Sequence, residues 1–555
     1  MGGWLAKGYT GKIARVAEPR PTIWRHLKRF GRNEDGTLIV FGLLVLVMMM
    51  VIGGIAVDVM RTEAVRVRLA NTSDAATLAA ASLSNVSNPT TVVTDYFAKA
   101  GLSAYLKGVS VSSSSTSRIV SADVGARVPT FFMHMIGIDS LSAPADSTAE
   151  QSASNLEISL VLDVSGSMNR NSKLQNLKNA ASQFVDTVMA GDIQNRISIS
   201  IIPFNGQVNL GPVLAGQYNI SSQHTFNTCV DLDPASFTQS AILPSTPLTR
   251  TDVIDPWSGG ILKPKPSGVT DQNYCTTDAR TIVRPFLRDI PTLKAAINGL
   301  VAEGNTSIDV GMKWGIALLD PNTQPVISNM IGAGEVPASF AGRPTAFGAA
   351  RFSKVVVVMS DGENTSQFQI QAPFKSGASP IYVDSATGSV AIYHAAAPGA
   401  SKYYVIPAAN YGQNWRTDTM GNWQATAPAG YVNVSWPEAT NLYPTHWIAT
   451  RLYGNALGTD SASRANAYNV AYGALQSSVG PTTKDTQLQQ ACDLAKSSAL
   501  QIKVFSIAFE APLAGQTALH NCATSDGDYF DVAGTDIVRA FQSIALQVSQ
   551  LRLTQ

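Results

Sequence analysis

The sequence predicts a doubly wound α/β domain with a mainly parallel sheet, preceded by one membrane-spanning helix. Two patterns lead to this fold class. An apolar run without any charge occupies residues 37–57. From about residue 155 onward, short apolar strand patterns alternate with amphipathic helical patterns, as is typical of strands covered by helices on both faces. With 555 residues, 45% of them hydrophobic, the chain is long enough for a large core and several domains.

A basic segment precedes the apolar run, because residues 1–36 hold eight Lys or Arg residues and only three acidic ones. As a helix, the run at 37–57 would be about 31 Å long, which matches the hydrocarbon core of a bilayer. A signal peptide is the competing interpretation, but its apolar region is usually only ~7–15 residues long. A buried helix of a soluble protein is the other alternative. Since Lys and Arg concentrate on the cytoplasmic side, we expect 1–36 in the cytoplasm and 58–555 across the membrane.

The helical pattern continues past the expected span. Residues 58–84 contain no Pro or Gly, so we expect one helix of roughly 45 residues that ends before Pro89. Residues 90–150 then predict short strands. A long apolar helix leading into a small sheet has the outline of a pilin-like subunit, and 58–150 is therefore expected to form a small α+β region.

The expected α/β domain covers 155–555. Its strand patterns lie at 158–163, 196–204, 354–360 and 502–509, and two apolar helix faces accompany them: Leu174, Leu177, Ala181, Phe184 and Val188, then Ile537, Phe541, Ile544, Val548 and Leu551. Two interruptions, at roughly 206–288 and 365–485, are expected to be large insertions. Between Tyr382 and Tyr453 the second holds eight of the 16 Tyr and four of the eight Trp residues. These rings predict a partner-binding surface, the core of a small β subdomain, or both.

The four cysteines form no CxxC pair, which argues against zinc and thioredoxin chemistry. Outside the cytoplasm they are expected to form disulfides. The economical pairing joins Cys229 to Cys275 and Cys492 to Cys522, and the other two connectivities stay open.

Oxygen-bearing side chains follow two of the predicted strands. Asp163, Ser165 and Ser167 are spaced by two residues, the side-chain period of extended backbone, so that their oxygens can point the same way. Asp361 follows another strand, and Thr306 lies at a probable helix start. In open α/β sheets, ligands bind at the carboxyl ends of the strands. Oxygen-only donor sets suit Mg²⁺, Ca²⁺ or Mn²⁺.

Mg²⁺ is the metal we expect first. It takes six ligands and holds water readily, so five protein oxygens would leave a place for a carboxylate from a protein partner. Taken singly, the same residues are also ordinary helix caps or turns. Three loops in this order, each after the correct strand or before the correct helix, favour the metal site.

Two other classes of function find little support. A net charge of +1 gives no reason to expect nucleic-acid binding. An enzyme with Ser165 as nucleophile would need a neighbouring base, and none of the six His residues stands in a triad-like context. The sequence around Ser165 is not GxSxG, and no phosphate-binding glycine loop follows the first strand. We expect a binding protein rather than an enzyme.

The residues DVSGSM at 163–168 match the DxSxS motif of von Willebrand factor A domains. Thr306 and Asp361 stand where that family places its other metal ligands, and Asn305 replaces a Gly that many members have. The resemblance covers 156–555 apart from the interruptions. It implies a Rossmann-like sheet with a metal-ion-dependent adhesion site, in which Ser165, Ser167 and Thr306 bind the metal directly. Asp163 and Asp361 would act partly through water.

The whole chain resembles the TadE/TadG-like proteins of Flp/Tad pilus assembly. The resemblance rests on the basic segment, the end of the span at Ala56-Val57-Asp58, SDAATLAAASL, FFMHMIGIDSLSAPADSTAE and the C-terminal YFDVAGTDIVRAFQSIALQVSQLRLT. It implies a single-pass component of pilus assembly in the bacterial inner membrane, with the N-terminus cytoplasmic and the bulk of the chain periplasmic. A membrane-anchored surface adhesin without a pilus is the alternative.

Overall fold

The computed structural model describes residues 37–551 apart from 83–84, 86, 114–116, 153–154, 191, 193–195, 257–273, 350, 398, 412 and 414–419. The chain divides into two compact units, Met1–Gln151 and Ser152–Gln555, and each is described by itself. The basic segment predicted at 1–36 lies outside the described residues.

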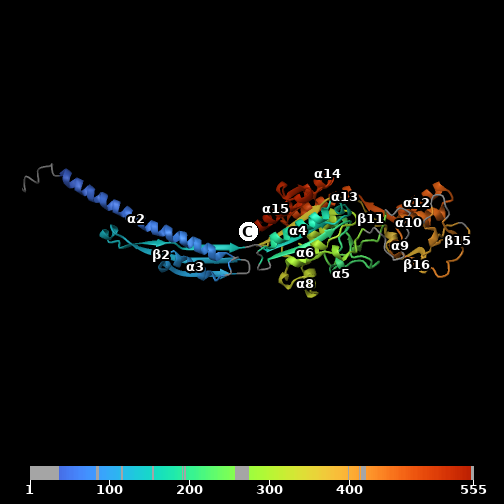
Figure 1. The fold of residues 1–555 in the computed structure, drawn as a ribbon, viewed down its shortest axis with the longest axis horizontal. Helices are drawn as coiled ribbons and strands as arrows, with labels where there is room; N and C mark the ends of the chain where they lie inside the picture. Colours follow the sequence, from blue (N-terminus) through green and yellow to red (C-terminus); the bar gives the residue numbers. More distant parts are fainter. Residues whose placement is uncertain are drawn as a thin grey trace, which may run out of the picture. The chain divides into compact units, whose positions relative to one another are not determined.

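The first unit is built on helix α2, which runs over Thr37–Ala81 and has 45 residues, as its sequence pattern predicts (Figure 1). It ends at Ala81, before Pro89, as expected. Among the described residues it is the one helix long and apolar enough to cross a membrane. Its N-terminal half exposes apolar side chains such as Leu43 and Met49, whereas Leu69, Ala76 and Ala80 in its C-terminal half are buried in the core of the unit.

A second helix, α3, occupies Pro89–Lys99, where only strands are predicted. The correction has a local cause. The Asn88 side chain accepts hydrogen bonds from the amides of Thr90 (2.9 Å) and Thr91 (3.4 Å), and Pro89 stands at the first helical position, where its missing N–H costs nothing. Pro89, which is expected to mark the end of the long helical pattern, is the first residue of α3. The predicted strands follow as β1 (Leu106–Ser113), β2 (Ser117–Pro129), β3 (Ser140–Pro144) and β4 (Ser147–Ser152).

The second unit contains a six-stranded sheet in the order β19-β18-β10-β5-β6-β9. Adjacent strands pair in parallel except β9, which is antiparallel to β6. Numbered along the chain, this is the 3-2-1-4-5-6 order of a Rossmann-type fold. All four predicted strands are confirmed, and the bounds are β5 (Asn155–Asp163), β6 (Ile197–Phe204), β9 (Arg284–Leu287), β10 (Phe352–Ser360), β18 (Lys503–Phe509) and β19 (Tyr529–Val532).

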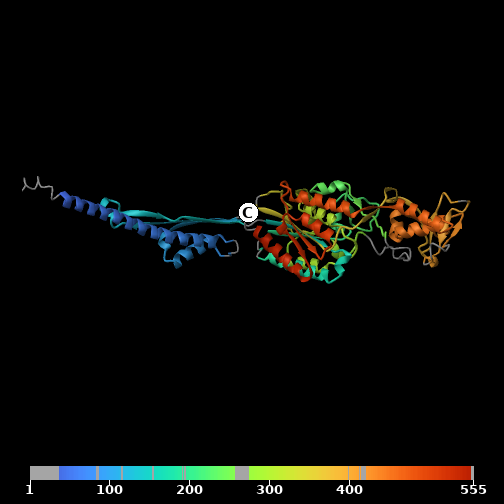
Figure 2. The same ribbon diagram turned by 90° about the horizontal axis from the view of Figure 1, so that it is seen from above.

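Helices cover both faces of this sheet (Figures 1 and 2). On one face, α4 (Lys173–Met189), α6 (Ile290–Gly299) and α15 (Ile537–Leu551) share a core with alternate strand residues such as Leu160. On the other, α7 (Ile308–Ala317), α13 (Pro481–Lys496) and α14 (Leu513–Cys522) pack with Val161 and its counterparts. The prediction of a mixed α/β domain with a mostly parallel sheet is therefore confirmed.

The first insertion, predicted at roughly 206–288, ends earlier than predicted. Residues 284–287 form β9, an edge strand of the central sheet, so the excursion from the sheet closes before Arg284. The strand has only four residues, including an Arg and a Pro, and therefore carries no apolar alternation that a sequence search could detect. The excursion itself contains α5 (Gly211–Ala215), β7 (Val230–Asp231) and β8 (Thr249–Arg250).

The second insertion is a small subdomain with its own core. Strands β11 (Gln367–Ile370) and β17 (Gln476–Val479) pair where the chain leaves the domain and returns. Because α13 begins at Pro481, the last residues of the predicted insertion, 481–485, belong to the domain. Between β11 and β17 lie a five-stranded antiparallel sheet and several short helices: β12 (Ala378–Val383), β13 (Val390–Tyr393), β14 (Tyr403–Ile406), β15 (Asn422–Gln424), β16 (Val432–Ser435), α9 (Trp436–Leu442), α10 (Thr445–Trp447), α11 (Asn455–Leu457) and α12 (Ser461–Leu475).

The aromatic side chains of this subdomain lie mostly inside it. Trp447 and Tyr404 are fully buried, and Tyr443 stacks on Trp447 with ring centroids 4.8 Å apart. Of the two predicted roles for these rings, the core of a small β subdomain is confirmed.

Both expected disulfides are present. Cys229 joins Cys275 within the first excursion, and Cys492 joins Cys522, which links α13 to α14.

Candidate metal centre

Three loops meet at the carboxyl edge of the central sheet. The first follows β5 at residues 163–167, the second precedes α7 at 303–306, and the third follows β10 at 361–365. Strands β5 and β10 are neighbours in parallel, with Leu162 paired to Met359, so their carboxyl ends deliver the first and third loops to the same place.

The first and third loops are joined through side-chain oxygens. Asp163 is fully buried; its Oδ1 accepts the amide of Ser165 (2.7 Å) and its Oδ2 accepts the hydroxyl of Ser360 (2.5 Å). The hydroxyls of Ser165 and Ser167 lie 3.0 Å apart, and Ser167 Oγ donates to Asp361 Oδ1 at 2.7 Å. Four of the five predicted ligands therefore form one connected set.

Thr306, the fifth residue, is brought to the same set by backbone hydrogen bonds. Its carbonyl accepts the amide of Thr365 (3.0 Å), and the amide of Gly166 donates to the carbonyl of Gly304 (2.9 Å). The Thr306 hydroxyl lies 3.4 Å from where a Cβ on Gly362 would stand. Gly304 has a φ of +75°, which a residue with a side chain rarely adopts. The structure thus brings all five predicted residues together.

The buried carboxyl of Asp163 has a perturbed pKa. Burial, together with the nearby charge of Asp361, raises the pKa of Asp163 to about 7. Lys173, at the start of α4, places its Nζ 3.0 Å from Asp361 Oδ2 and 3.7 Å from Glu510 Oε2. The lysine supplies one positive charge beside the two buried carboxylates.

The donor set is that of a hard divalent cation: two carboxylates and three hydroxyls, with no sulfur or imidazole. Within the described part of the chain, no group of three or more His, Cys, Asp or Glu side chains could hold a metal ion. A centre at this edge would therefore depend on the Ser and Thr hydroxyls as much as on the two acids.

Lys484 is a part of the site that the sequence analysis missed. Its side chain is 1% exposed, and its Nζ donates to the carbonyls of Thr306 (3.2 Å) and Thr365 (3.1 Å) and to the Ser307 hydroxyl. The same ammonium lies 3.7 Å from Asp309 Oδ1. Lys484 thus joins the second and third loops, because its ammonium hydrogen-bonds a backbone carbonyl of each. In the run PTTKDTQLQQ it resembles any lysine of a solvated helix face.

Asn305 also has a structural role. Its Nδ2 donates to the hydroxyl of Tyr274 at 3.1 Å, and that hydroxyl donates to the carbonyl of Ser366 at 3.0 Å. The side chain that replaces a family glycine therefore ties the Thr306 loop to the first excursion and to the chain after Asp361.

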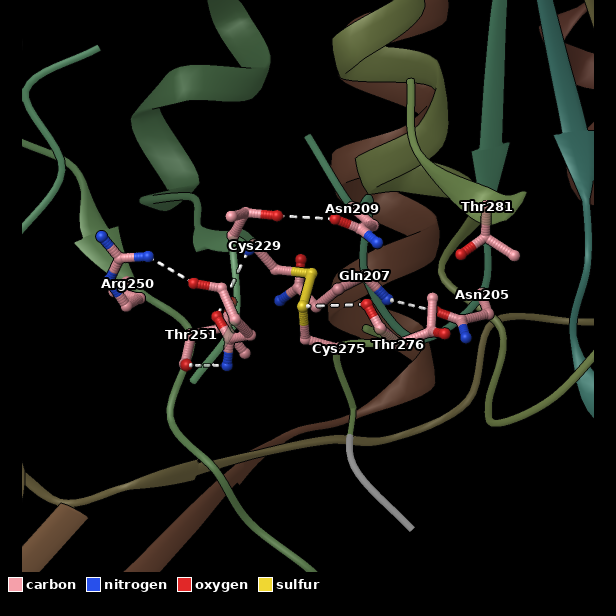
Figure 3. Close-up of a disulfide and its surroundings, with 12 residues drawn as sticks. Asn205, Gln207, Asn209, Cys229, Arg250, Thr251, Cys275, Thr276 and Thr281 are labelled. Atoms are coloured by element: carbon pink, nitrogen blue, oxygen red, sulfur yellow. Dashed lines mark hydrogen bonds between the residues drawn. A yellow bond between two sulfur atoms is a disulfide. The ribbon is translucent and has the colours of Figure 1, made fainter. Parts of the chain in front are cut away.

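The Cys229–Cys275 disulfide supports this arrangement (Figure 3). Thr276, next to Cys275, hydrogen-bonds Glu303 through its hydroxyl. Asn205, which follows β6 and is drawn next to Thr276 in Figure 3, donates to the carbonyl of Glu303 at 3.0 Å. The disulfide fixes the segment that positions residues 303–306.

The chain was compared with known proteins. The family model for Flp pilus-assembly TadE/G-like proteins matches residues 36–83. No curated protein matches the chain.

Among solved structures, the chain is similar to the von Willebrand factor domain of the type V pili tip protein Mfa5 from Porphyromonas gingivalis. That match has 11% identity and a TM-score of 0.30 and covers 73% of this chain and 97% of that one. The PilB minor pilin from Streptococcus sanguinis matches with 12% identity, a TM-score of 0.27 and coverages of 80% and 78%. The pilus adhesin SpaC from Lactobacillus rhamnosus GG matches with 11% identity, a TM-score of 0.26 and coverages of 80% and 34%.

The sheet order and the DxSxS loop at its carboxyl edge resemble those of von Willebrand factor A domains, and in the chain this α/β domain follows one long apolar helix. The match at 36–83 is narrower and concerns the N-terminal region alone, which is similar to that of Flp pilus-assembly TadE/G-like proteins.

The contacts of Lys484 lead to a test of its supporting role. Lys484→Met leaves Asp309 buried without its cation and removes the donor to two loop carbonyls. We expect the free energy of unfolding to fall by about 3–5 kcal/mol, the usual cost of breaking a buried ion pair. Urea denaturation of the full chain measures it.

The matched control is Lys294→Met, which breaks the exposed pair with Asp186 (2.7 Å) and should cost at most about 1 kcal/mol. Equal losses in the two variants would contradict the role given to Lys484.

Proposed function

We propose that this chain is a TadG-like, membrane-anchored component of Flp/Tad pilus assembly that binds a protein partner through a divalent metal ion. The observation that carries the proposal is the convergence of Asp163, Ser165, Ser167, Thr306 and Asp361 at one edge of the sheet. Mg²⁺ is the expected ion, with Ca²⁺ or Mn²⁺ as the other candidates. When bound, the ion would present an open coordination place to a carboxylate of the partner.

The membrane arrangement follows from α2 and the charges before it. The apolar part of this helix anchors the chain as a single span in the bacterial inner membrane, with the basic residues 1–36 in the cytoplasm. The α/β domain is then periplasmic, where both disulfides are stable.

Binding rather than catalysis is the proposed activity. The Ser165 hydroxyl lies 3.0 Å from the Ser167 hydroxyl and also interacts with the Asp163 carboxylate, and both partners belong to the proposed metal site. Among the histidines of the domain, His224 is buried near Arg250, and both effects lower its pKa to about 4. Proteins of the pilus-assembly family matched by the N-terminal region are generally not enzymes.

The metal site is tested by Asp163→Ala in the purified full chain. Because Asp163 contributes one of only two carboxylates, its loss should weaken Mg²⁺ binding by at least about a hundredfold, roughly 2.7 kcal/mol. Isothermal titration calorimetry with MgCl₂ gives the dissociation constant. Asp186→Ala, which removes an exposed acid of α4, should leave that constant unchanged. Equal Mg²⁺ affinity in wild type and Asp163→Ala would refute the metal site.

Lys173 competes with a metal ion for Asp361, since its Nζ already lies 3.0 Å from Oδ2. Removing this positive charge in Lys173→Met should tighten Mg²⁺ binding by about tenfold, or ~1.4 kcal/mol. The control Lys178→Met removes the same charge from the same helix, five residues further along. If Lys173→Met binds Mg²⁺ no more tightly than Lys178→Met, Lys173 does not compete with the metal ion for Asp361.

The role in pilus assembly is tested by counting surface pili in a strain lacking this gene, complemented with wild type or Asp163→Ala at equal membrane abundance. We expect wild type to restore pili and the variant to fail. If Asp163→Ala restores pili as well as wild type does, the metal site is not required for assembly. A deletion strain that keeps its pili would favour the alternative, a membrane-anchored surface adhesin without a pilus.

A further inference from the structure

The loop at residues 131–138, between β2 and β3, exposes an unusual number of large apolar side chains. The exposed fractions are 66% for Phe131, 45% for Phe132, 79% for Met135, 53% for Ile136 and 37% for Ile138. In water this cluster would be costly, since each large apolar side chain gains about 1.5–3 kcal/mol on full burial. A contiguous apolar patch of this kind on a protein surface marks an interaction site.

The position of the loop along α2 identifies what it meets. Asp58 immediately follows the apolar run and is buried, and its carboxylate accepts the amides of Phe131 (2.9 Å), Phe132 (2.8 Å) and Met133 (2.8 Å). One helical turn back, Gly54 lies against the ring of Phe132, whose Cγ is only 2.5 Å from where a Cβ on Gly54 would stand. The loop therefore sits on the last turn of the apolar run.

These contacts also explain two residues of the helix. Any side chain at position 54 would displace the Phe132 ring, so Gly54 admits the loop to the helix surface. Asp58 is an acid at the end of a membrane-spanning run, and three backbone amides satisfy it. A carboxylate so satisfied can stay at this depth, whereas an unpaired one would be expensive there.

Charge near the loop fits a lipid surface. The side chain of Arg61, one turn beyond Asp58, places Nη1 4.0 Å from Asp58 Oδ1 and its guanidinium 4.1 Å from the ring centroid of Phe131, and it remains 42% exposed. A cation at this level can meet lipid phosphates while neighbouring apolar side chains enter the acyl region. The helix residues at the same level, Val57 (45% exposed) and Met60 (70% exposed), are open apolar positions as well, so the loop widens a surface that is already apolar.

We propose that the 131–138 loop is a second membrane-contacting element, which inserts Phe131, Met135 and Ile136 into the non-cytoplasmic face of the bilayer beside α2. Asp58 positions it there. The loop enlarges the footprint of the anchor and fixes the tilt and rotation of α2 in the membrane, as interfacial side chains do for other single spans. The inference rests on the proposed anchoring by α2.

The test uses the full chain in vesicles of phosphatidylethanolamine and phosphatidylglycerol. All four native cysteines are in disulfides, so one introduced cysteine can be labelled with an environment-sensitive fluorophore. The probe site is Met135→Cys. Met49→Cys (65% exposed) reports the span itself, and Leu78→Cys (69% exposed) lies twenty residues beyond Asp58, about 30 Å further along the helix.

We expect lipids carrying a nitroxide to quench the label at 135 at least about threefold more than the label at 78, with emission shifted to the blue. Adding Asp58→Asn to Met135→Cys should reduce that quenching, because one of the two acceptor oxygens becomes an NH₂ group, which cannot accept from the loop amides. Equal quenching at 135 and 78 overturns the proposal. A label at 135 shielded from both lipid and aqueous quenchers also overturns it, in favour of a protein contact. Absence of quenching at 49 would refute the anchoring by α2 itself, a separate failure.

Discussion

Two carboxylates that end neighbouring strands are the constraint around which the α/β domain is organised. Asp163 and Asp361 are brought together because β5 and β10 pair in parallel and end at the same level. Both are buried, so their charges raise the free energy of the folded state unless a cation, a hydroxyl or an amide faces them. Ser167 bridges the two loops and Lys173 adds a positive charge. The rest of the edge is built to keep this arrangement in place.

The two excursions from the sheet also help to hold the loops of this edge. The first contributes Tyr274 and the segment fixed by the Cys229–Cys275 disulfide, and both contact the Thr306 loop. From the chain that follows the second come Lys484 and Asp485, the latter accepting from Asn364 at 2.9 Å. Side chains distant in sequence thus hold the loops rigidly, and a preformed set of oxygens binds a cation with less loss of conformational entropy than a mobile one.

The first unit uses one buried acid in a different way. Asp58 lies where the apolar run of α2 ends, and it accepts three consecutive amides of the loop after β2. This carboxylate joins the helix to the loop, and it also lies 4.0 Å from Nη1 of Arg61. In the domain, by contrast, Asp163 and Asp361 belong to one connected set of side-chain oxygens.

Apolar periodicity and hard local signals were enough to predict much of this protein. The span with its continuation in α2 and the four central strands follow from sequence because each depends on neighbours within a few residues. The membership of Asp163, Ser165, Ser167, Thr306 and Asp361 in one loop cluster follows from a motif of fixed spacing and from strand and helix ends. The disulfides join cysteines 46 and 30 residues apart, and the sequence offers their pairing only as the economical one of three. The short edge strand β9 and helix α3 were not predicted. A strand of four residues shows too little apolar alternation, and α3 depends on the Asn88 cap at its start.

The supporting residues could be identified only from the tertiary structure. Lys173, Lys484 and Tyr274 are ordinary in their local sequence, and their contacts with the site span 188, 178 and 31 residues along the chain. The choice between a surface and a core for the Tyr and Trp side chains was likewise a matter of packing. Sequence determined which oxygens would gather, because strand ends fix them; the fold alone decided which charges and hydrogen bonds hold them, because burial is a property of three-dimensional contact.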